Sequence, residues 1–159
     1  MRKVCFFLGQ RSPCGTQLPG LAAELTRHIE GYGVRDFVVG RYGAGARLAA
    51  EAVVMEKKRF PEIRLLRLRP YPLHGAACIP KGADGVIAPP GFADLPVALA
   101  LARADLYMLR HSSFLIAYAP QPELHVQEVL AFARQMQAHG LLHLTELHGP
   151  GEILAASRL

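Results

Sequence analysis

The chain has 159 residues, about the size of one domain. Its residues are 51% hydrophobic and only 19% charged, which supplies a core and excludes a chain that is disordered throughout. No run of about 18 apolar residues is present, so we expect no membrane span. The apolar stretch from Val4 to Leu8 is too short for a signal-peptide core. These features predict an unprocessed cytoplasmic protein with a single domain over residues 1–159.

The charged residues and the cysteines limit the kinds of partner. The net charge is +5, and 14 arginines stand against four lysines. Guanidinium groups hold phosphate with two parallel hydrogen bonds, so an anionic partner fits, although GC-rich coding produces the same arginine excess. Cys5, Cys14 and Cys78 have no CxxC spacing, and the seven histidines are spread along the chain. We therefore expect neither a disulfide framework nor a metal site.

The first half of the chain alternates strands with helices. Short apolar runs predict strands at Lys3–Leu8, Asp36–Gly40 and Ile63–Leu68. Between them, apolar residues at helical spacing predict helices over Leu18–Tyr32 and Ala44–Phe60. This β-α-β-α-β order is typical of parallel strands joined by right-handed crossovers.

The second half begins with an irregular stretch. Residues 69–91 hold five prolines and four glycines, and we read them as one long loop, either functional or a plain surface excursion. Regular structure is then predicted at Leu95–His111 (helix), Phe114–Tyr118 (strand), Glu123–His139 (helix) and about Leu141–Leu147 (strand). The predicted fold is α/β, a Rossmann-like doubly wound, mainly parallel five-stranded sheet with helices on both faces.

Apolar residues on the last two predicted helices allow two arrangements. Leu101, Leu109, Val129 and Phe132 can pair two copies of the chain, or they can pack onto their own sheet. The first arrangement would make the protein a homo-oligomer.

Ligands of open α/β sheets bind beyond the carboxyl ends of the strands, which places the candidate site in the loops there. After the second strand come Gly40, Arg41, Tyr42 and Gly43, directly before a helix. The glycines permit close backbone approach, the helix start favours an anion, Arg41 can bind phosphate, and Tyr42 can stack on a base. The pattern is neither a dinucleotide fingerprint nor a Walker loop, and the same residues suit a glycine-rich connecting turn.

The loop after the first strand and one helical arginine complete the candidate residues. Gly9 ends the strand, Gln10 offers an amide for a base edge or ribose, and Arg11 adds a cation. Gln10 and Arg11 can equally well be ordinary polar residues at the protein surface. Cys14 lies in the same loop and has no assigned role. Arg103 lies on a largely apolar helix, where burying its charge without a partner would be costly. We therefore expect it to pair with a carboxylate, such as that of Asp105 or Glu51, or with a ligand.

The order of these motifs resembles YpsA-like proteins, small bacterial members of the SLOG superfamily. That superfamily also contains the Lonely Guy phosphoribohydrolases and the nucleotide-binding core of the DNA-processing protein DprA. The likeness covers roughly residues 2 to 140 and rests on the segments 3–11, 37–44, 47–51, 69–71, 84–85, 103–108 and 112–118.

The resemblance implies a Rossmann-like sheet and a pocket for a nucleotide or nucleotide-derived ligand. Gly9, Gln10 and Arg11, Gly40, Arg41, Tyr42 and Gly43, and Arg103 fall on matching pocket positions. The family's usual histidine before the first-loop arginine is Gln10 here, and its usual asparagine between the second-loop glycines is Arg41. Ligand preference is therefore expected to differ from that of relatives.

A further departure concerns catalysis. Phosphoribohydrolase members carry a Pro-Gly-Gly-x-Gly-Thr-x-x-Glu loop, whereas the corresponding loop here is Pro120-Gln-Pro-Glu123. Proline has no amide donor, so this loop cannot form the same phosphate cradle. Glu123 is the only candidate catalytic residue, and a glutamate at a helix start is also an ordinary partner of the helix dipole.

Three functions follow from these observations. The first is a nucleotide-type sensor or ligand-presenting protein without strong catalysis and without an identified cofactor. The second is a nucleotide phosphoribohydrolase that uses Glu123. The third is a DNA-binding accessory protein, against which stands the absence of a lysine and arginine stripe.

Overall fold

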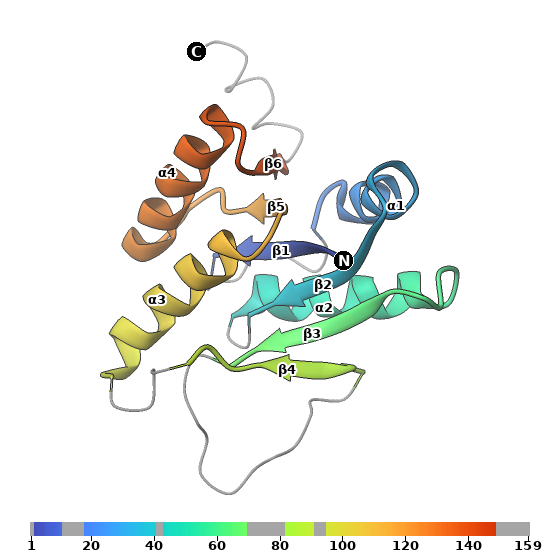
Figure 1. Ribbon diagram of the computed structural model, residues 1–159, viewed down its shortest axis with the longest axis horizontal. Coiled ribbons are helices and arrows are strands. Elements are labelled where there is room, and N and C mark those ends of the chain that lie inside the picture. Colours follow the sequence, from blue (N-terminus) through green and yellow to red (C-terminus); the bar gives the residue numbers. More distant parts are fainter. Residues whose placement is uncertain (1, 11–17, 41–42, 70–81, 91–94, 149–159) are drawn as a thin grey trace, which may run out of the picture.

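The computed structural model describes residues 2–10, 18–40, 43–69, 82–90 and 95–148 (Figure 1). Its elements, in chain order, are β1 (Lys3–Gly9), α1 (Leu21–Tyr32), β2 (Val34–Val39), α2 (Ala44–Lys57), β3 (Arg64–Leu68), β4 (Gly85–Ile87), α3 (Val97–Arg110), β5 (Phe114–Tyr118), α4 (Leu124–Ala138) and β6 (His143–Glu146). The strands form one sheet in the order β4-β3-β2-β1-β5-β6, and every neighbouring pair is parallel. The predicted α/β, Rossmann-like architecture is confirmed.

The sheet is covered on both faces, as β1 shows residue by residue. Cys5 and Phe7 point into a core cluster shared with α1 and α2, whereas Phe6 and Leu8 point into a second cluster shared with α3 and α4. All four side chains are buried, because successive side chains of a strand face opposite sides and both sides here carry helices. Figure 1 shows the two helix pairs on either side of the sheet.

The sheet has six strands, one more than the sequence predicted. The additional strand, β4, lies inside the stretch read as a loop and pairs with β3 through Leu66, Arg67 and Leu68. It is only three residues long and each of them is half-buried, so its apolar pair Val86 and Ile87 gives no periodic signal. Residues 70–81 of the same stretch lie outside the described part of the chain.

Three of the four apolar residues considered for pairing two copies pack within their own fold. Leu109 and Val129 are buried in the cluster under α3 and α4, and the half-buried Phe132 packs against it. Leu101 is half-buried on α3, and self-association stays a prediction. None of the helices in the described segments is long and apolar enough to cross a bilayer.

Candidate functional site

The strand order places a switch point between β1 and β5. From β1 the chain builds outward through β2, β3 and β4, and it then returns through α3 to place β5 on the other side of β1. In doubly wound sheets, ligands bind beyond the carboxyl ends of the strands at such a switch point. Gly9 and Gln10 lie at the end of β1, and Tyr118 ends β5.

Gln10 joins the two sides of this switch point. Its side chain is buried, and its Oε1 accepts a hydrogen bond of 2.8 Å from the backbone N–H of Gln121 in the β5–α4 loop. Its own backbone N–H donates to the carbonyl of Tyr118 at 3.4 Å. The side-chain carbonyl of Gln10 thus fixes the β5–α4 loop.

Two glycines bring the start of α2 against the end of β1. A Cβ atom on Gly9 would lie 2.9 Å from a ring carbon of Phe7 and 3.3 Å from the Cα of Gly45. A Cβ atom on Gly45 would lie 3.2 Å from the carbonyl oxygen of Gln10. Gly45 thus has protein backbone as its close neighbour. The signal that could have shown this is its position one residue inside a helix that must cross the end of β1.

Gly43 shapes the amino terminus of α2. Its φ of 98° and ψ of 159° form a conformation that side chains with a Cβ rarely adopt. The first helical bond runs from the N–H of Arg47 to the carbonyl of Gly43 at 3.3 Å, so the N–H groups of Ala44, Gly45 and Ala46 have no partner within the helix. These groups and the helix dipole favour an anion beside Gly43.

The remaining candidate residues divide into three cases. Gly40 directly follows β2, and apart from its chain neighbours no atom of the described residues lies within 4 Å of the position of a Cβ there, which leaves room beside it. Arg11, Arg41 and Tyr42, together with Cys14, lie outside the described residues. Arg103 is exposed on α3, so the cost of burying an unpaired charge does not arise there.

Glu123 is the N-cap residue of α4 and is half-buried at the switch-point edge. It makes no side-chain capping hydrogen bond, and its backbone carbonyl accepts from the N–H of Gln127 at 2.9 Å. The Glu51 carboxylate, weighed as a partner for Arg103, pairs instead with Arg47 at 3.2 Å. The structure therefore brings Gly9, Gln10 and Gly43 to one edge of the sheet, with Glu123 following the loop that Gln10 holds.

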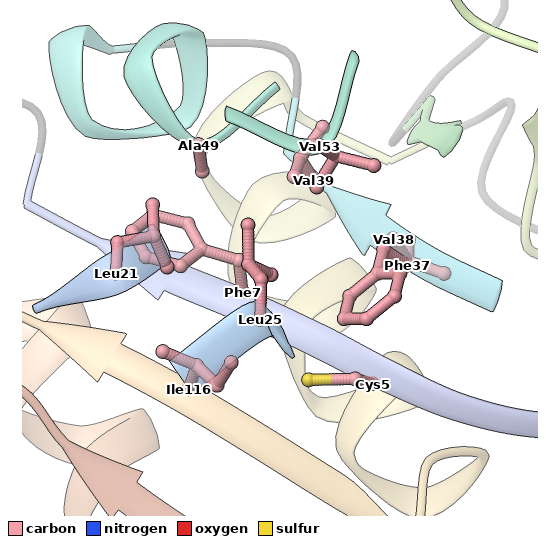
Figure 2. Close-up of a pocket in the computed structure, with 10 residues that line it drawn as sticks. All are labelled: Cys5, Phe7, Leu21, Leu25, Phe37, Val38, Val39, Ala49, Val53 and Ile116. Atoms are coloured by element: carbon pink, nitrogen blue, oxygen red, sulfur yellow. The ribbon is translucent and has the colours of Figure 1, made fainter. Parts of the chain in front are cut away.

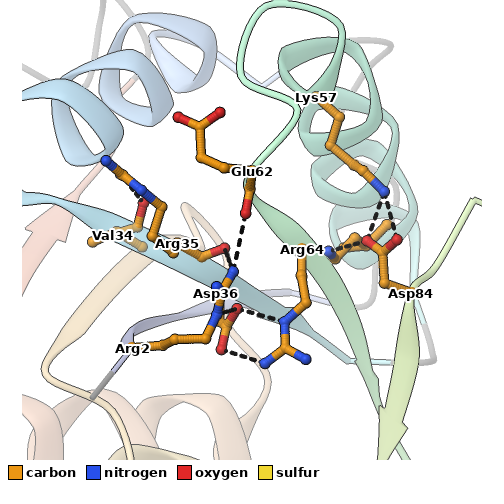
Figure 3. A network of polar contacts seen from close by, with 9 residues as sticks. Arg2, Val34, Arg35, Asp36, Lys57, Glu62, Arg64 and Asp84 are labelled. Carbon is orange, nitrogen blue, oxygen red and sulfur yellow. Dashed lines mark hydrogen bonds and ion pairs between the residues drawn. The ribbon is translucent and has the colours of Figure 1, made fainter.

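Among the described residues, an ion-pair network lies at the opposite edge of the sheet, near the amino ends of the strands (Figure 3). Asp36 accepts hydrogen bonds from Arg2 Nε at 2.8 Å and from Arg64 Nε and Nη2 at 2.9 and 2.8 Å. Burial alone would raise the pKa of Asp36, but the hydrogen bonds and charges of Arg64 and Arg2 lower that pKa below its usual value. Asp84 pairs with Lys57 at 2.6 Å and accepts from the N–H of Leu65 at 2.8 Å. These contacts join the start of the chain to β2 and β3, and β3 to the residues just before β4. The role of this network is therefore structural.

The core cavity drawn in Figure 2 is a packing gap. Its volume is about 10 Å³, and it lies between α1, α2 and the sheet with apolar residues such as Phe7, Leu25 and Val53 around it. A space of this size holds one water at most, and apolar walls leave that water without hydrogen-bond partners. A second small hollow, of about 50 Å³, lies beside the ends of β5 and β6 and is lined by Pro120, Glu146 and His148 among others.

In the described segments, no three histidine, cysteine, aspartate or glutamate side chains gather into a group that could hold a metal ion. No protein-family model matches the chain, and the search of curated proteins finds no match. What the structure shows is a parallel α/β, Rossmann-like fold whose switch-point loops are tied together by Gln10.

Proposed function

We propose that this protein binds a nucleotide or nucleotide-derived small molecule at the carboxyl edge of its sheet, as a sensor or ligand-presenting protein of the SLOG type without strong catalysis. The observation that carries the proposal is the meeting of the β1 end, the β2 end and the start of α2 at the switch point. There Gly9 and Gly45 allow backbone contact, and Gly43 aims the first amides of α2 outward from the helix.

The chemistry of this edge suits a phosphate with an attached base. Three N–H groups without partners in the helix and the positive end of the α2 dipole supply donors for an anion. In this proposal Arg11 and Arg41 add guanidinium groups, and Tyr42 offers a ring for stacking. Gly40 leaves open space where a side chain would otherwise stand.

The β5–α4 loop supports binding without strong catalysis. Pro120 and Pro122 have no N–H group, and the N–H of Gln121 already donates to Gln10. Three consecutive residues of the loop therefore offer no backbone donor to a phosphate. A phosphoribohydrolase-type cradle, which depends on backbone donors, is not expected in this loop.

A phosphoribohydrolase remains the second candidate because Glu123 lies half-buried directly after that loop. Its carboxylate is the acidic group that would assist cleavage of an N-glycosidic bond. Incubation with nucleoside monophosphates, followed by chromatography for the free base, tests this function. Release of base by the wild-type protein that is lost in Glu123→Gln would favour the hydrolase over the sensor.

Binding itself is tested by a thermal-shift panel of nucleotides, dinucleotides and ADP-ribose-type compounds. A ligand at about 100 times its dissociation constant adds about 2.7 kcal/mol of stability, which raises Tm by about 5 °C or more for a chain of this size. Arg41→Ala should abolish the shift, whereas Lys58→Ala, which removes an exposed charge at the far end of α2, should retain it. No shift with any compound, or equal shifts in both variants, would contradict the proposal. A DNA-binding protein would instead give a mobility shift that weakens steeply with salt.

A further inference from the structure

A groove on the outer flank of α2 is larger than the two hollows described above. Its volume is about 600 Å³, within the range of about 300 to 1,000 Å³ typical of small-molecule sites. Leu65 and Arg67 of β3 line it on one side, and Arg47, Glu51 and Val54 of α2 on the other. In Figure 1 this is the region where α2 passes beside β3.

Close packing and hydrogen bonds hold one end of the groove in place. Gly82 lines it with a φ of +85°, and a Cβ atom there would lie 3.1 Å from Val54. The adjoining Asp84 binds Lys57 of α2 and the N–H of Leu65, and its backbone N–H donates to the carbonyl of Leu65 at 2.7 Å (Figure 3). These bonds fix the entry to β4 against both walls of the groove.

Arg67 is an unusual residue at its place in the sheet. Its register partners are Val39 of β2 and Val86 of β4, so a guanidinium-bearing side chain stands in a row of valines on the α2 face. The side chain is half-buried, and its Nε and Nη1 atoms are shielded from solvent. A guanidinium that is partly shielded from water interacts more strongly with an anion than a fully solvated one does, because the local dielectric constant is lower.

We propose that this groove binds a small organic anion with an apolar body, the anionic group lying at Arg67 and the body against Val54 and Leu65. The lining holds two arginines, Arg47 and Arg67, and one carboxylate, Glu51, so its formal charge is positive and favours an anion. Met55 lies on the rim with 59% of its surface exposed, and methionine adapts well to apolar ligands. The site is separate from the switch point and does not depend on the nucleotide proposal.

The test uses 8-anilinonaphthalene-1-sulfonate, an aromatic sulfonate whose fluorescence rises on binding, and its neutral relative N-phenyl-1-naphthylamine. The folded wild-type protein should bind one equivalent of the sulfonate saturably, and the neutral probe at least fivefold more weakly. Arg67→Gln should weaken sulfonate binding at least tenfold. Arg59→Gln, which removes an exposed cation at the end of α2, should leave the affinity within twofold.

Two further variants keep the test decisive if Arg67→Gln fails to fold. Glu51→Gln removes the negative charge of an exposed ion pair and should tighten sulfonate binding at least twofold. Ala50→Leu should weaken it by narrowing the groove. Arg41→Ala, which disables the proposed nucleotide site, should have no effect.

Three results would overturn the proposal. They are the absence of saturable binding to the natively folded protein, equal affinity for the charged and neutral probes, and unchanged affinity in Arg67→Gln or, should that variant not fold, in both Glu51→Gln and Ala50→Leu.

Discussion

Replacing Asp36 with asparagine should destabilise the fold by an amount that depends on pH. The carboxylate is 5% exposed and accepts three hydrogen bonds, two from Arg64 and one from Arg2. Asparagine has nearly the same shape, but its NH₂ group would face guanidinium donors. The substitution therefore removes charge and acceptors without creating a cavity.

The size of the effect follows from burial. Hydrogen bonds to charged groups contribute about 1.5 to 3 kcal/mol each when shielded, but exposed ion pairs contribute about 1 kcal/mol or less. Arg64 and Arg2 are 48% and 44% exposed, so the lower end of the range applies to both. We expect a loss of about 2 kcal/mol at pH 7, which corresponds to a fall in Tm of about 4 to 8 °C.

The pH dependence has a definite sign. Because the pKa of Asp36 is lowered in the folded protein, its contribution is fully present above the ordinary aspartate pKa of about 3.9. It disappears as the pH falls through the lower pKa of the folded state. The difference in stability between wild type and Asp36→Asn should therefore shrink as the pH falls below about 3.9, and it should go on shrinking until the pH is below the lowered pKa of the folded protein.

Urea denaturation at several pH values measures this difference. Glu30→Gln removes an exposed carboxylate from α1 and should change stability by less than about 0.5 kcal/mol at any pH. If Asp36→Asn were as stable as wild type at pH 7, or if the difference were equal at pH 7 and pH 2, the structural role given to this network would be refuted.

Three other outcomes are expected. Gly43→Ala should lower the free energy of unfolding, measured by urea denaturation, by about 1 to 3 kcal/mol because Gly43 has a φ of 98°. Gly40→Ala should lower it by less than about 1 kcal/mol, because nothing lies within 4 Å of the Cβ position at Gly40. Equal losses in the two variants would contradict the backbone geometry. Burial lowers the pKa of His28, which lies against Glu24, Arg27 and His143, so the stability of the fold should decline as the pH falls below about 6.5. In urea denaturation at several pH values, His28→Phe should make this decline less steep. An unchanged dependence on pH would mean that other groups cause the decline. Burial also raises the pKa of the Cys5 thiol above its usual value. In a variant with Cys14→Ser and Cys78→Ser, Cys5 should therefore react with a disulfide reagent only as the protein unfolds. Fast labelling of the native state would be inconsistent with the burial of Cys5.

The strands at the centre of the sheet could be predicted because burial on both faces makes each one a continuous apolar run. Cys5 to Leu8 and Leu115 to Tyr118 are runs of this kind. β4 could not be predicted, since an edge strand of three half-buried residues needs only its pairing with β3 to form. Tertiary pairing, which no local pattern reports, decides such short elements.

The sequence could predict at which edge of the sheet the candidate site lies, but not the contacts between the residues there. Loops after β1 and β2 must meet at one edge in a parallel sheet, so Gly9, Gln10 and Gly43 could be grouped from the sequence. The bond from Gln121 to Gln10 spans 111 positions of the chain, and no local motif reports it. Likewise, the placement of Gly45 against Gln10 depends on how α2 crosses the sheet.

The central claim is that the carboxyl edge beside α2 binds a nucleotide-type ligand. The most direct measurement is a two-dimensional ¹H–¹⁵N NMR titration of the labelled protein with ADP-ribose and adenosine 5′-monophosphate. We expect saturable shifts of the backbone amides of Ala44, Gly45, Ala46 and Gln121, with the amino-end residues Asp36 and Arg64 unchanged. Absence of shifts with both compounds, or shifts confined to residues away from that edge, would contradict it.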